Sequence, residues 1–451
     1  MGDYSEFLKR KSQLGGDHGF EPTFMPGFLF DFQAHLVSWS IRKGRAAEFA
    51  DCGMGKTPMQ LVWGENVVRH ENKPVLIMAP LSVSGQTVEE AEKFEIEAIR
   101  CMDGRHSGSR IIVTNYERLH YFNPDDFAGV VCDESSIIKN FDGSRKSEIT
   151  EFMKKVKYRL LCTATAAPND YIELGTSSEA LGYLGYMDML TTFFKNDENS
   201  INPAFIGSKW RFKPHAERDF WRWMASWSRA CRRPSDLGFD DGKFILPNLV
   251  EVEQVVESPL PYNSLWHEPA VTLEEQRADT KETVQSRSEA VAALLQDDLS
   301  GIAWCHLNAE ADLLEKIIPG AVQVSGSDKD ERKEEVFQAF RHGQIRVLVT
   351  KPKIAAFGMN WQHCSHMTYF PTHSFEQYYQ AVRRCWRFGQ QNPVKVDVVT
   401  SSAQTGVLAN LQRKSVACDV MFTQLVQEMN NAISLDRMRK FETIEQVPSW
   451  L

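Results

Sequence analysis

A glycine-containing loop that follows an apolar run is the part of the sequence best suited to chemistry. Residues 46–57 read Ala-Ala-Glu-Phe-Ala-Asp-Cys-Gly-Met-Gly-Lys-Thr. The two glycines let backbone N–H groups turn towards phosphate oxygens, the lysine places a charge on the outer phosphates, and the threonine hydroxyl can bind Mg²⁺. Ala50 stands where the strict phosphate-loop pattern has glycine, so a chance turn is the alternative. The expected nucleotide contacts are Gly53, Met54, Gly55, Lys56 and Thr57.

An acidic pair follows the apolar run Gly129–Cys132. Asp133 and Glu134 would lie at the carboxyl edge of a parallel sheet, where a phosphate loop also opens. At that edge Asp133 can hold Mg²⁺, usually through water, and Glu134 can position and deprotonate an attacking water. The alternative is a solvated acid pair at the end of a strand.

Two arginines in the second half of the chain share one face of an expected helix. Arg384 and Arg387 are three residues apart in the run Gln380-Ala-Val-Arg-Arg-Cys-Trp-Arg-Phe-Gly-Gln390. Two guanidiniums at this spacing can clamp a γ-phosphate and stabilise the charge that develops on it. A basic, solvated helix face is the alternative. Upstream, Gly358 gives flexibility to a loop that could couple the phosphates to a cleft between domains.

Short apolar runs rich in β-branched residues alternate with amphipathic stretches, over residues 45–181 and again over 301–400. This alternation is typical of parallel α/β sheets, and it occurs twice. Apolar residues near the end of the chain have helical spacing. The expected segments are a domain at 1–185, a partly helical insertion at 186–290, a second domain at 291–402 and a helical tail at 403–451. The expected strands are Ala46–Ala50, Val75–Ala79, Ile111–Asn115, Gly129–Cys132, Tyr158–Thr163, Ile302–His306, Ala321–Val324, Ile345–Thr350, Met367–Phe370 and Val394–Val399.

Composition limits the classes of protein to which the chain can belong. Of 451 residues, 42% are hydrophobic and 25% are charged, which excludes a disordered chain and allows two or three domains. Nine scattered cysteines without a C-x-x-C pair predict a reduced cytoplasmic protein without a zinc site. We expect neither a signal peptide nor a membrane span, because no stretch approaches ~18 apolar residues. The formal charge of −9 requires any nucleic-acid surface to be a local basic patch.

A basic and aromatic segment at residues 209–233 is the candidate for such a patch. Eight basic residues and only two acidic ones lie in it, interleaved with four tryptophans and two phenylalanines. The charge would attract a phosphate backbone, and exposed rings could stack on bases. Packing of the tryptophans against the first domain is an equally weighted alternative, in which the arginines rather than the tryptophans face solvent.

In their order along residues 30–400, these segments resemble the motifs of superfamily-two helicases and, more narrowly, of Swi/Snf-type translocases. The narrower resemblance rests on Ile138-Lys139-Asn140, on Asn169 and on the Arg-x-Gly-Gln ending of the arginine motif. The motif set is Gln33, Ala50–Thr57, Asp133-Glu134, Thr163-Ala-Thr165, Gly358-Met-Asn360 and Gln380–Gln390.

The sequence departs from the family at three positions. Ser136 stands where the family usually has His, which affects how nucleotide state is signalled to the nucleic acid. The loop from Asp51 to Lys56 is one residue shorter than usual, and Arg383 stands where Gly is frequent. The combination Asp-Glu-Ser-Ser with Thr-Ala-Thr-Ala-Ala-Pro-Asn-Asp170 resembles compact helicase-like proteins of bacteriophages and prophages.

The resemblance implies an α/β fold of two RecA-like parallel-sheet lobes with ATP at their interface, a partly helical insertion and a C-terminal helix. It implies that Gln33 contacts adenine and that the loop residues already named bind the phosphates. It also implies that Thr57 and Asp133 hold Mg²⁺. The residues implied in catalysis are Lys56, Glu134, Arg384 and Arg387, with Gly358 and Gln380 lining the same cleft. The implied nucleic-acid contacts are Ser82, Gln86, Thr114, Asn115, Lys209, Arg211, Arg222, Arg229 and Lys351.

The function that this resemblance implies is a DNA-dependent ATPase that uses ATP and Mg²⁺ to move along duplex DNA. A strand-separating DNA helicase and an RNA helicase are alternatives, and a non-enzymatic interaction protein with a decayed ATP site is a third class. Retention of the catalytic set argues against that third class. The expected partner is nucleic acid, duplex DNA foremost, with an unknown protein partner of phage replication or recombination and no membrane. The expected location is the cytoplasm, that of the bacterial host if a phage or prophage encodes the chain.

Overall fold

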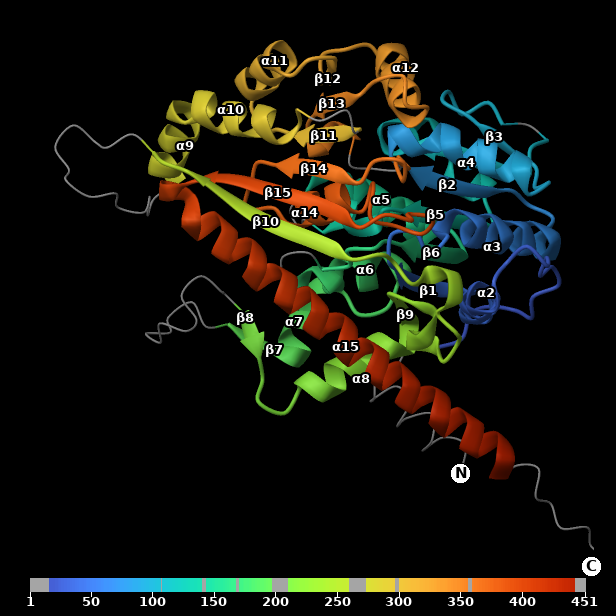
Figure 1. The fold of residues 1–451 in the computed structure, drawn as a ribbon. Helices are drawn as coiled ribbons and strands as arrows, with labels where there is room; N and C mark the ends of the chain where they lie inside the picture. Colours follow the sequence, from blue (N-terminus) through green and yellow to red (C-terminus); the bar gives the residue numbers. More distant parts are fainter. Residues whose placement is uncertain are drawn as a thin grey trace, which may run out of the picture. The chain divides into compact units, whose positions relative to one another are not determined.

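A computed structural model describes residues 16–106, 108–139, 143–167, 170–196, 210–258, 273–296, 300–355 and 359–442. The chain forms two compact units (Figure 1). Unit 1 comprises Met1–Asp241 together with Cys418–Leu451, and unit 2 comprises Gly242–Ala417. Each unit is built around one parallel sheet, and each is described by itself.

Unit 1 contains a seven-stranded parallel sheet in the order β3-β4-β2-β5-β6-β1-β9. All residues of β2, β4, β5 and β6 are buried, which is why most of their residues are apolar. The strands are β1 (Arg45–Ala50), β2 (Val75–Ala79), β3 (Ala98–Arg100), β4 (Ile111–Asn115), β5 (Gly129–Asp133), β6 (Tyr158–Cys162) and β9 (Ser228–Cys231).

Helices and a small two-stranded sheet complete the first part of unit 1. The helices are α2 (Asp31–Lys43), α3 (Lys56–Glu71), α4 (Leu81–Lys93), α5 (Ser144–Lys155), α6 (Leu174–Leu181), α7 (Tyr186–Phe193) and α8 (Glu217–Trp227). The antiparallel strands are β7 (Phe194–Asn196) and β8 (Trp210–Phe212). Short 3₁₀ helices lie at Tyr116–Tyr121, Pro124–Asp126, Ser135–Ile138, Tyr171–Glu173 and Pro234–Leu237.

Unit 2 contains a six-stranded parallel sheet in the order β10-β15-β14-β11-β13-β12. Its core includes the buried side chains of Trp304, Trp361 and Tyr369. The strands are β10 (Leu249–Val256), β11 (Gly301–Trp304), β12 (Ala321–Val324), β13 (Val347–Thr350), β14 (His366–Tyr369) and β15 (Val394–Ser401). The helices are α9 (Leu273–Glu282), α10 (Val284–Leu294), α11 (Asn308–Ile317), α12 (Asp330–Arg341), α13 (Pro352–Ala355) and α14 (Phe375–Val382), with 3₁₀ turns at Gly242–Phe244 and Ser402–Gln404.

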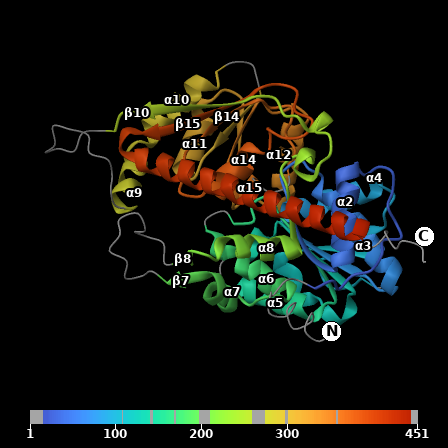
Figure 2. The same cartoon turned by 90° about the horizontal axis from the view of Figure 1, so that it is seen from below.

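The long C-terminal helix α15 (Thr405–Glu442) is divided between the units at residue 418. In unit 1, its second part packs beside α8 (Figure 2), and Arg218 forms an ion pair with Glu428 at 3.7 Å. The Met429 sulfur accepts a hydrogen bond from the N–H of Ala230 in β9 at 3.0 Å, and Phe422 is buried nearby. The end of the chain therefore supplies part of the core of unit 1.

The structure confirms the expected fold of two parallel-sheet α/β units with a C-terminal helix. It corrects the expected boundaries of the insertion at 186–290. Residues up to 241 belong to unit 1, because β9 pairs with β1 and extends its sheet. Residues from 242 belong to unit 2, where β10 pairs with β15 along its whole length. The expected tail at 403–451 is likewise shared between the two units. No helix in the described ranges is long and apolar enough to cross a membrane.

A fully buried carboxylic acid lies on β1, three residues before the phosphate loop begins at Asp51. Burial raises the pKa of Glu48 from 4.5 to about 7, and the Ser40 hydroxyl offsets part of this rise. The unfolded chain therefore releases this proton at lower pH than the folded chain does. The free energy of unfolding is expected to fall by about 3 kcal/mol between pH 4.5 and 7 because of this one group.

The variant Glu48→Gln should remove this contribution and raise stability at pH 8 relative to the parent chain. Chemical unfolding of both proteins at several pH values gives the free energy of unfolding of each. The difference between the two values isolates Glu48, because the other titrating groups contribute equally to both. A difference that stays constant from pH 4.5 to pH 8 would contradict the prediction.

Candidate nucleotide and nucleic-acid sites

The loop between β1 and α3 has the backbone of a phosphate cradle. Gly53 and Gly55 have φ angles of 89° and 77°, in the left-handed region that glycine adopts readily. A Cβ atom at Gly55 would lie 2.2 Å from the side-chain nitrogen of Gln33. Helix α3 begins at Lys56, so its first backbone N–H groups and the positive end of its dipole open towards the loop.

Lys56 extends back over this loop. Its Nζ donates to the carbonyl of Ala50 at 3.1 Å and lies 3.5 Å from the carbonyl of Asp51. Burial alone would lower the pKa of Lys56, but the nearby Cys52, Glu134, Asp133 and Asp51 raise it above its usual value. The ammonium group is therefore charged, and it lies within the field of the acidic pair.

Gln33 on α2 braces the loop. Its side-chain Nε2 donates to the carbonyl of Met54 at 2.9 Å, and its Oε1 accepts from the N–H of Phe30 at 3.0 Å. The side chain is only 4% exposed. The structure thus places Gln33 against the phosphate loop, and its contact with adenine stays a prediction.

The acidic pair lies at the end of β5, joined to the same helix that carries Lys56. The Asp133 carboxylate accepts a hydrogen bond from Gln60 Nε2 at 2.7 Å, and Gln60 lies one turn after Lys56 on α3. Burial raises the pKa of Asp133, while Lys56 and Gln60 oppose the rise. Gln60 was not among the expected site residues, although its spacing of four from Lys56 places both on one helix face.

Glu134 adopts a backbone conformation that is unusual for a residue other than glycine. Its φ angle is 51°, in the left-handed region, at the turn between β5 and the 3₁₀ helix Ser135–Ile138. Such conformations cost of order 1–3 kcal/mol and cluster at functional sites. Tyr116 follows β4. Its hydroxyl donates a hydrogen bond to the Asp133 carbonyl, which stabilises the end of β5.

In unit 2, the two predicted arginines converge on one carbonyl group. Arg384 donates to the Met359 carbonyl at 3.1 Å and to the Gln380 carbonyl at 3.0 Å, and Arg387 reaches the same Met359 carbonyl at 3.4 Å. Arg384 is 2% exposed and Gln380 is fully buried, whereas Arg387 is half-buried. Gly358 lies outside the described residues, as do Asn140 and Asn169.

The predicted nucleic-acid contacts differ in accessibility. Gln86 on α4 is half-buried and bonds to Glu90 at 2.9 Å, and Lys351 after β13 is half-buried and bonds to Asn308. Thr114 and Asn115 end β4 and are 0% and 3% exposed, so their side chains do not reach the surface. Ser82 lies on α4. Lys209 lies outside the described residues.

The basic and aromatic segment is mainly a core element. Trp221, Trp223 and Trp227 of α8 are all buried, which decides between the two alternatives for these rings in favour of packing. Arg229 is also buried: its guanidinium donates to the carbonyls of Ala225 and Ser228 and lies 4.1 Å from the ring centroid of Trp39. The expected contact of Arg229 with nucleic acid is therefore wrong for this conformation. Arg222 is exposed and Arg211 is half-buried, so both stay candidates.

Truncating Trp227 to alanine is expected to destabilise unit 1 by about 3–5 kcal/mol, because the ring is fully buried against Trp223 and Phe49. The exposed Arg222→Ala variant should change stability by less than about 0.5 kcal/mol. Chemical unfolding of the two variants tests the contrast. A Trp227→Ala protein with unchanged stability would refute the core assignment.

Part of the chain is similar in sequence to a known protein family. Residues 289–389 match the family described as helicase conserved C-terminal domain. This match lies within unit 2. The matched residues run from within α10 to Gly389, so they include Arg384 and Arg387.

Two curated relatives match a shorter part of the chain. The DNA annealing helicase and endonuclease ZRANB3 of Bos taurus is 29% identical over 180 residues, and that of Mus musculus is 28% identical over 180 residues. Each alignment covers 36% of this chain and 17% of the relative, so the chain spans only a small part of their length. Together with the family match, these relatives confirm the resemblance to helicases. The resemblance to phage proteins stays a prediction.

Two solved structures were matched along most of the chain. Saccharomyces cerevisiae Dbp5 bound to RNA and ADP BeF3 matches with a TM-score of 0.57 at 12% identity, covering 88% of this chain and 93% of that chain. The Sulfolobus solfataricus SWI2/SNF2 ATPase core in complex with dsDNA matches with a TM-score of 0.42 at 16% identity, covering 90% and 96%. The Dbp5 match shows that the RecA-like architecture expected from the motifs is the architecture of this chain.

Proposed function

We propose that the chain is a nucleic-acid-dependent ATPase that moves along duplex DNA. The observation that carries the proposal is the joint placement of Lys56 and Gln60 on α3, with Gln60 bonded to Asp133. This hydrogen bond ties the phosphate loop to the acidic pair, as phosphoryl transfer to water requires. The helicase C-terminal domain of unit 2 supports a motor rather than a simple nucleotide-binding protein.

The residues of the loop and of β5 fit ATP with Mg²⁺. The glycine cradle and the charged Lys56 suit phosphate oxygens, and the Asp133 carboxylate and Thr57 hydroxyl are oxygen donors of the kind that Mg²⁺ prefers. When bound, Mg²⁺ would neutralise charge on the phosphates. Glu134 would orient the attacking water and accept its proton, while Gln33 would hold the loop in shape through Met54.

The motor part of the proposal requires movement between the units. Binding of ATP to unit 1 would draw the arginine motif of unit 2 towards the phosphates, and hydrolysis would release it. Alternating grip on one strand of the duplex would then convert hydrolysis into stepping. Arg384 and Arg387 are the residues that this cycle needs from unit 2.

Duplex DNA is the preferred track because the curated relatives are named as DNA annealing helicases. ATPase rates should be compared with duplex DNA, single-stranded DNA and RNA at one salt concentration, and a forked duplex should test for strand separation. Greatest stimulation by duplex DNA without displacement supports a translocase. Greatest stimulation by RNA, or displacement of a strand, would replace the proposal by an RNA helicase or a strand-separating DNA helicase.

The setting of this activity is part of the proposal. A bacterial cytoplasm and a partner of phage replication or recombination follow from the resemblance to phage proteins alone. Stimulation by DNA should weaken between low and moderate salt, because an acidic protein can bind DNA only through a local basic surface. Stimulation that does not change with salt would refute the local-patch account.

A further inference from the structure

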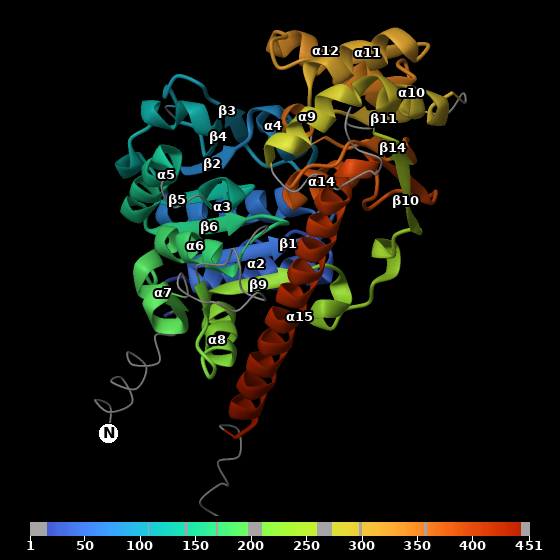
Figure 3. The ribbon, with the colours of Figure 1, turned by 90° about the vertical axis from the view of Figure 1, so that its left-hand side faces the viewer.

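The outermost strand of the unit 2 sheet has one unused edge. Strand β10 pairs with β15 along all eight residues, and it ends the strand order (Figure 3). The Val394 N–H donates to the Asn248 carbonyl at 2.9 Å, so Asn248 directs its backbone groups towards β15. Because these directions alternate along a strand, the backbone groups of Leu249, Glu251, Glu253 and Val255 point outwards. Among the described strands, none pairs with that outer edge.

This edge lacks most of the devices that usually prevent strand addition, and its only charged side chains are those of two glutamates. Natural edge strands are commonly short, or carry proline, lysine or a bulge. Strand β10 has neither proline, lysine nor arginine, and its register with β15 is continuous. Two of its valines, Val250 and Val255, are 46% and 53% exposed. An edge of this length and composition is suited to accept another strand.

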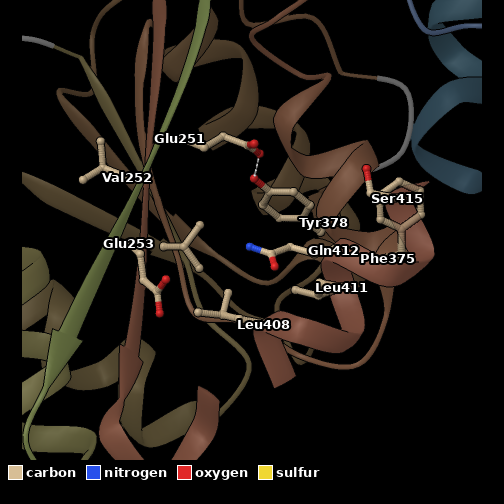
Figure 4. A pocket seen from close by; sticks show the side chains of 10 residues that line it. Glu251, Val252, Glu253, Phe375, Tyr378, Leu408, Leu411, Gln412 and Ser415 are labelled. Carbon is tan, nitrogen blue, oxygen red and sulfur yellow. Dashed lines mark hydrogen bonds between the residues drawn. The ribbon is translucent and has the colours of Figure 1, made fainter. Parts of the chain in front are cut away.

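An apolar pocket opens beside the same strand (Figure 4). It has a volume of about 270 Å³ and lies between β10, α14 and the part of α15 that belongs to unit 2. Tyr378 forms part of its wall, and its hydroxyl donates to the carboxylate of Glu251 on β10. The other apolar lining residues are Val252, Phe375, Val398, Leu408 and Leu411. Such a pocket can take one large side chain of a strand laid along β10.

The negative charge along β10 indicates which kind of partner can bind this edge. Glu251 and Glu253 are exposed and line the pocket, and Glu257 follows the strand. With no basic residue on β10, this surface repels a nucleic-acid backbone and attracts a cationic peptide.

We propose that an extended, basic peptide segment of a protein partner adds to β10 as a further strand and places a large apolar side chain in the adjoining pocket. Main-chain hydrogen bonds to the outward groups of β10 would supply affinity, and the pocket and the two glutamates would supply specificity. This interaction is separate from ATP hydrolysis, so its test does not depend on the proposed activity.

The probe is a fluorescent octapeptide, Val-Lys-Val-Phe-Val-Lys-Val-Lys, titrated with the full chain by anisotropy. Two control peptides keep its composition: one has the residues in scrambled order, and the other carries methyl groups on alternate backbone nitrogens. We expect binding of the probe and at least tenfold weaker binding of both controls. No binding of the probe, or equal binding of the methylated peptide, would overturn strand addition.

Variants of the chain test the contributions of charge and of backbone hydrogen bonding separately. Glu253→Lys should weaken binding at least tenfold by reversing the charge, and Glu253→Pro should do so by removing an outward N–H without touching the ladder to β15. The matched control is Glu334→Lys on the exposed face of α12, which should bind as the parent does. Thermal unfolding checks that each variant is folded. Equal loss in Glu253→Lys and Glu334→Lys would mean nonspecific attraction and would refute the site.

A second copy of this chain is the competing occupant. Sedimentation of the parent and of Glu253→Pro over a range of concentrations distinguishes it. Self-association that is lost in Glu253→Pro would assign the edge to a homodimer and overturn the proposal of a different partner. A parent chain that stays monomeric while binding the probe supports it.

Discussion

Replacing Glu134 with glutamine is expected to lower the rate of DNA-stimulated ATP hydrolysis by about 10²–10⁴-fold while leaving nucleotide binding intact. The amide keeps the shape of the side chain but cannot accept the proton of the attacking water. The left-handed backbone of residue 134, directly after β5, holds the side chain beside Asp133, which would still be able to hold Mg²⁺. Steady-state phosphate release gives the rate, and titration calorimetry with ATP gives the affinity.

A second variant separates binding from catalysis. Lys56→Ala should lose affinity for ATP as well as activity, because Lys56 is the cation placed over the phosphate loop. Glu89→Gln, on the exposed face of α4, is the matched control and should retain full activity. If hydrolysis survives in both Lys56→Ala and Glu134→Gln, the proposed mechanism is wrong.

Replacing Arg387 with alanine is expected to lower the hydrolysis rate by about 10³-fold or more with little effect on the stability of unit 2. An arginine that stabilises charge on the transferred phosphoryl group contributes on this scale. Arg387 is half-buried and its hydrogen bond to the Met359 carbonyl is long at 3.4 Å, so this bond contributes little to stability. Phosphate release and chemical unfolding together measure the two effects.

Arg384→Ala should behave differently from Arg387→Ala. Arg384 is buried and holds the carbonyls of Gln380 and Met359, so its removal should also lower the free energy of unfolding by about 1–3 kcal/mol. Arg341→Ala, at the exposed end of α12, controls for the loss of a surface arginine. An Arg387→Ala enzyme with activity within threefold of the parent would remove Arg387 from the catalytic machinery.

The buried strands were predictable because their apolar runs leave little freedom of assignment. Val75–Ala79 and Ile111–Asn115 match the structure at both ends. The partly buried strand Ala321–Val324 also does so. Strand β9 was missed because Ser-Arg-Ala-Cys does not read as an apolar run. Its Arg229 is compatible with burial only because local carbonyls accept its hydrogen bonds, and a sequence pattern does not show this.

The same limit applies to the candidate site. The phosphate loop and the acidic pair were predictable, since their chemistry follows from residue type and from their position after strands. The bond between Gln60 and Asp133 joins residues far apart in the chain and depends on how α3 lies against β5. The role of the tryptophans in α8 depended on which side of that helix faces the sheet, and composition alone does not determine this.

The division of α15 between the units has a consequence for biosynthesis. Unit 1 is discontinuous, because the whole of unit 2 is inserted between residue 241 and residue 418. A ribosome therefore completes unit 2 before it makes the segment that bears Phe422 and Met429, which unit 1 buries. Until that segment emerges, nascent unit 1 lacks part of its core. Unit 1 can therefore complete its folding only after unit 2 has been synthesised, although most of unit 1 precedes unit 2 in the chain.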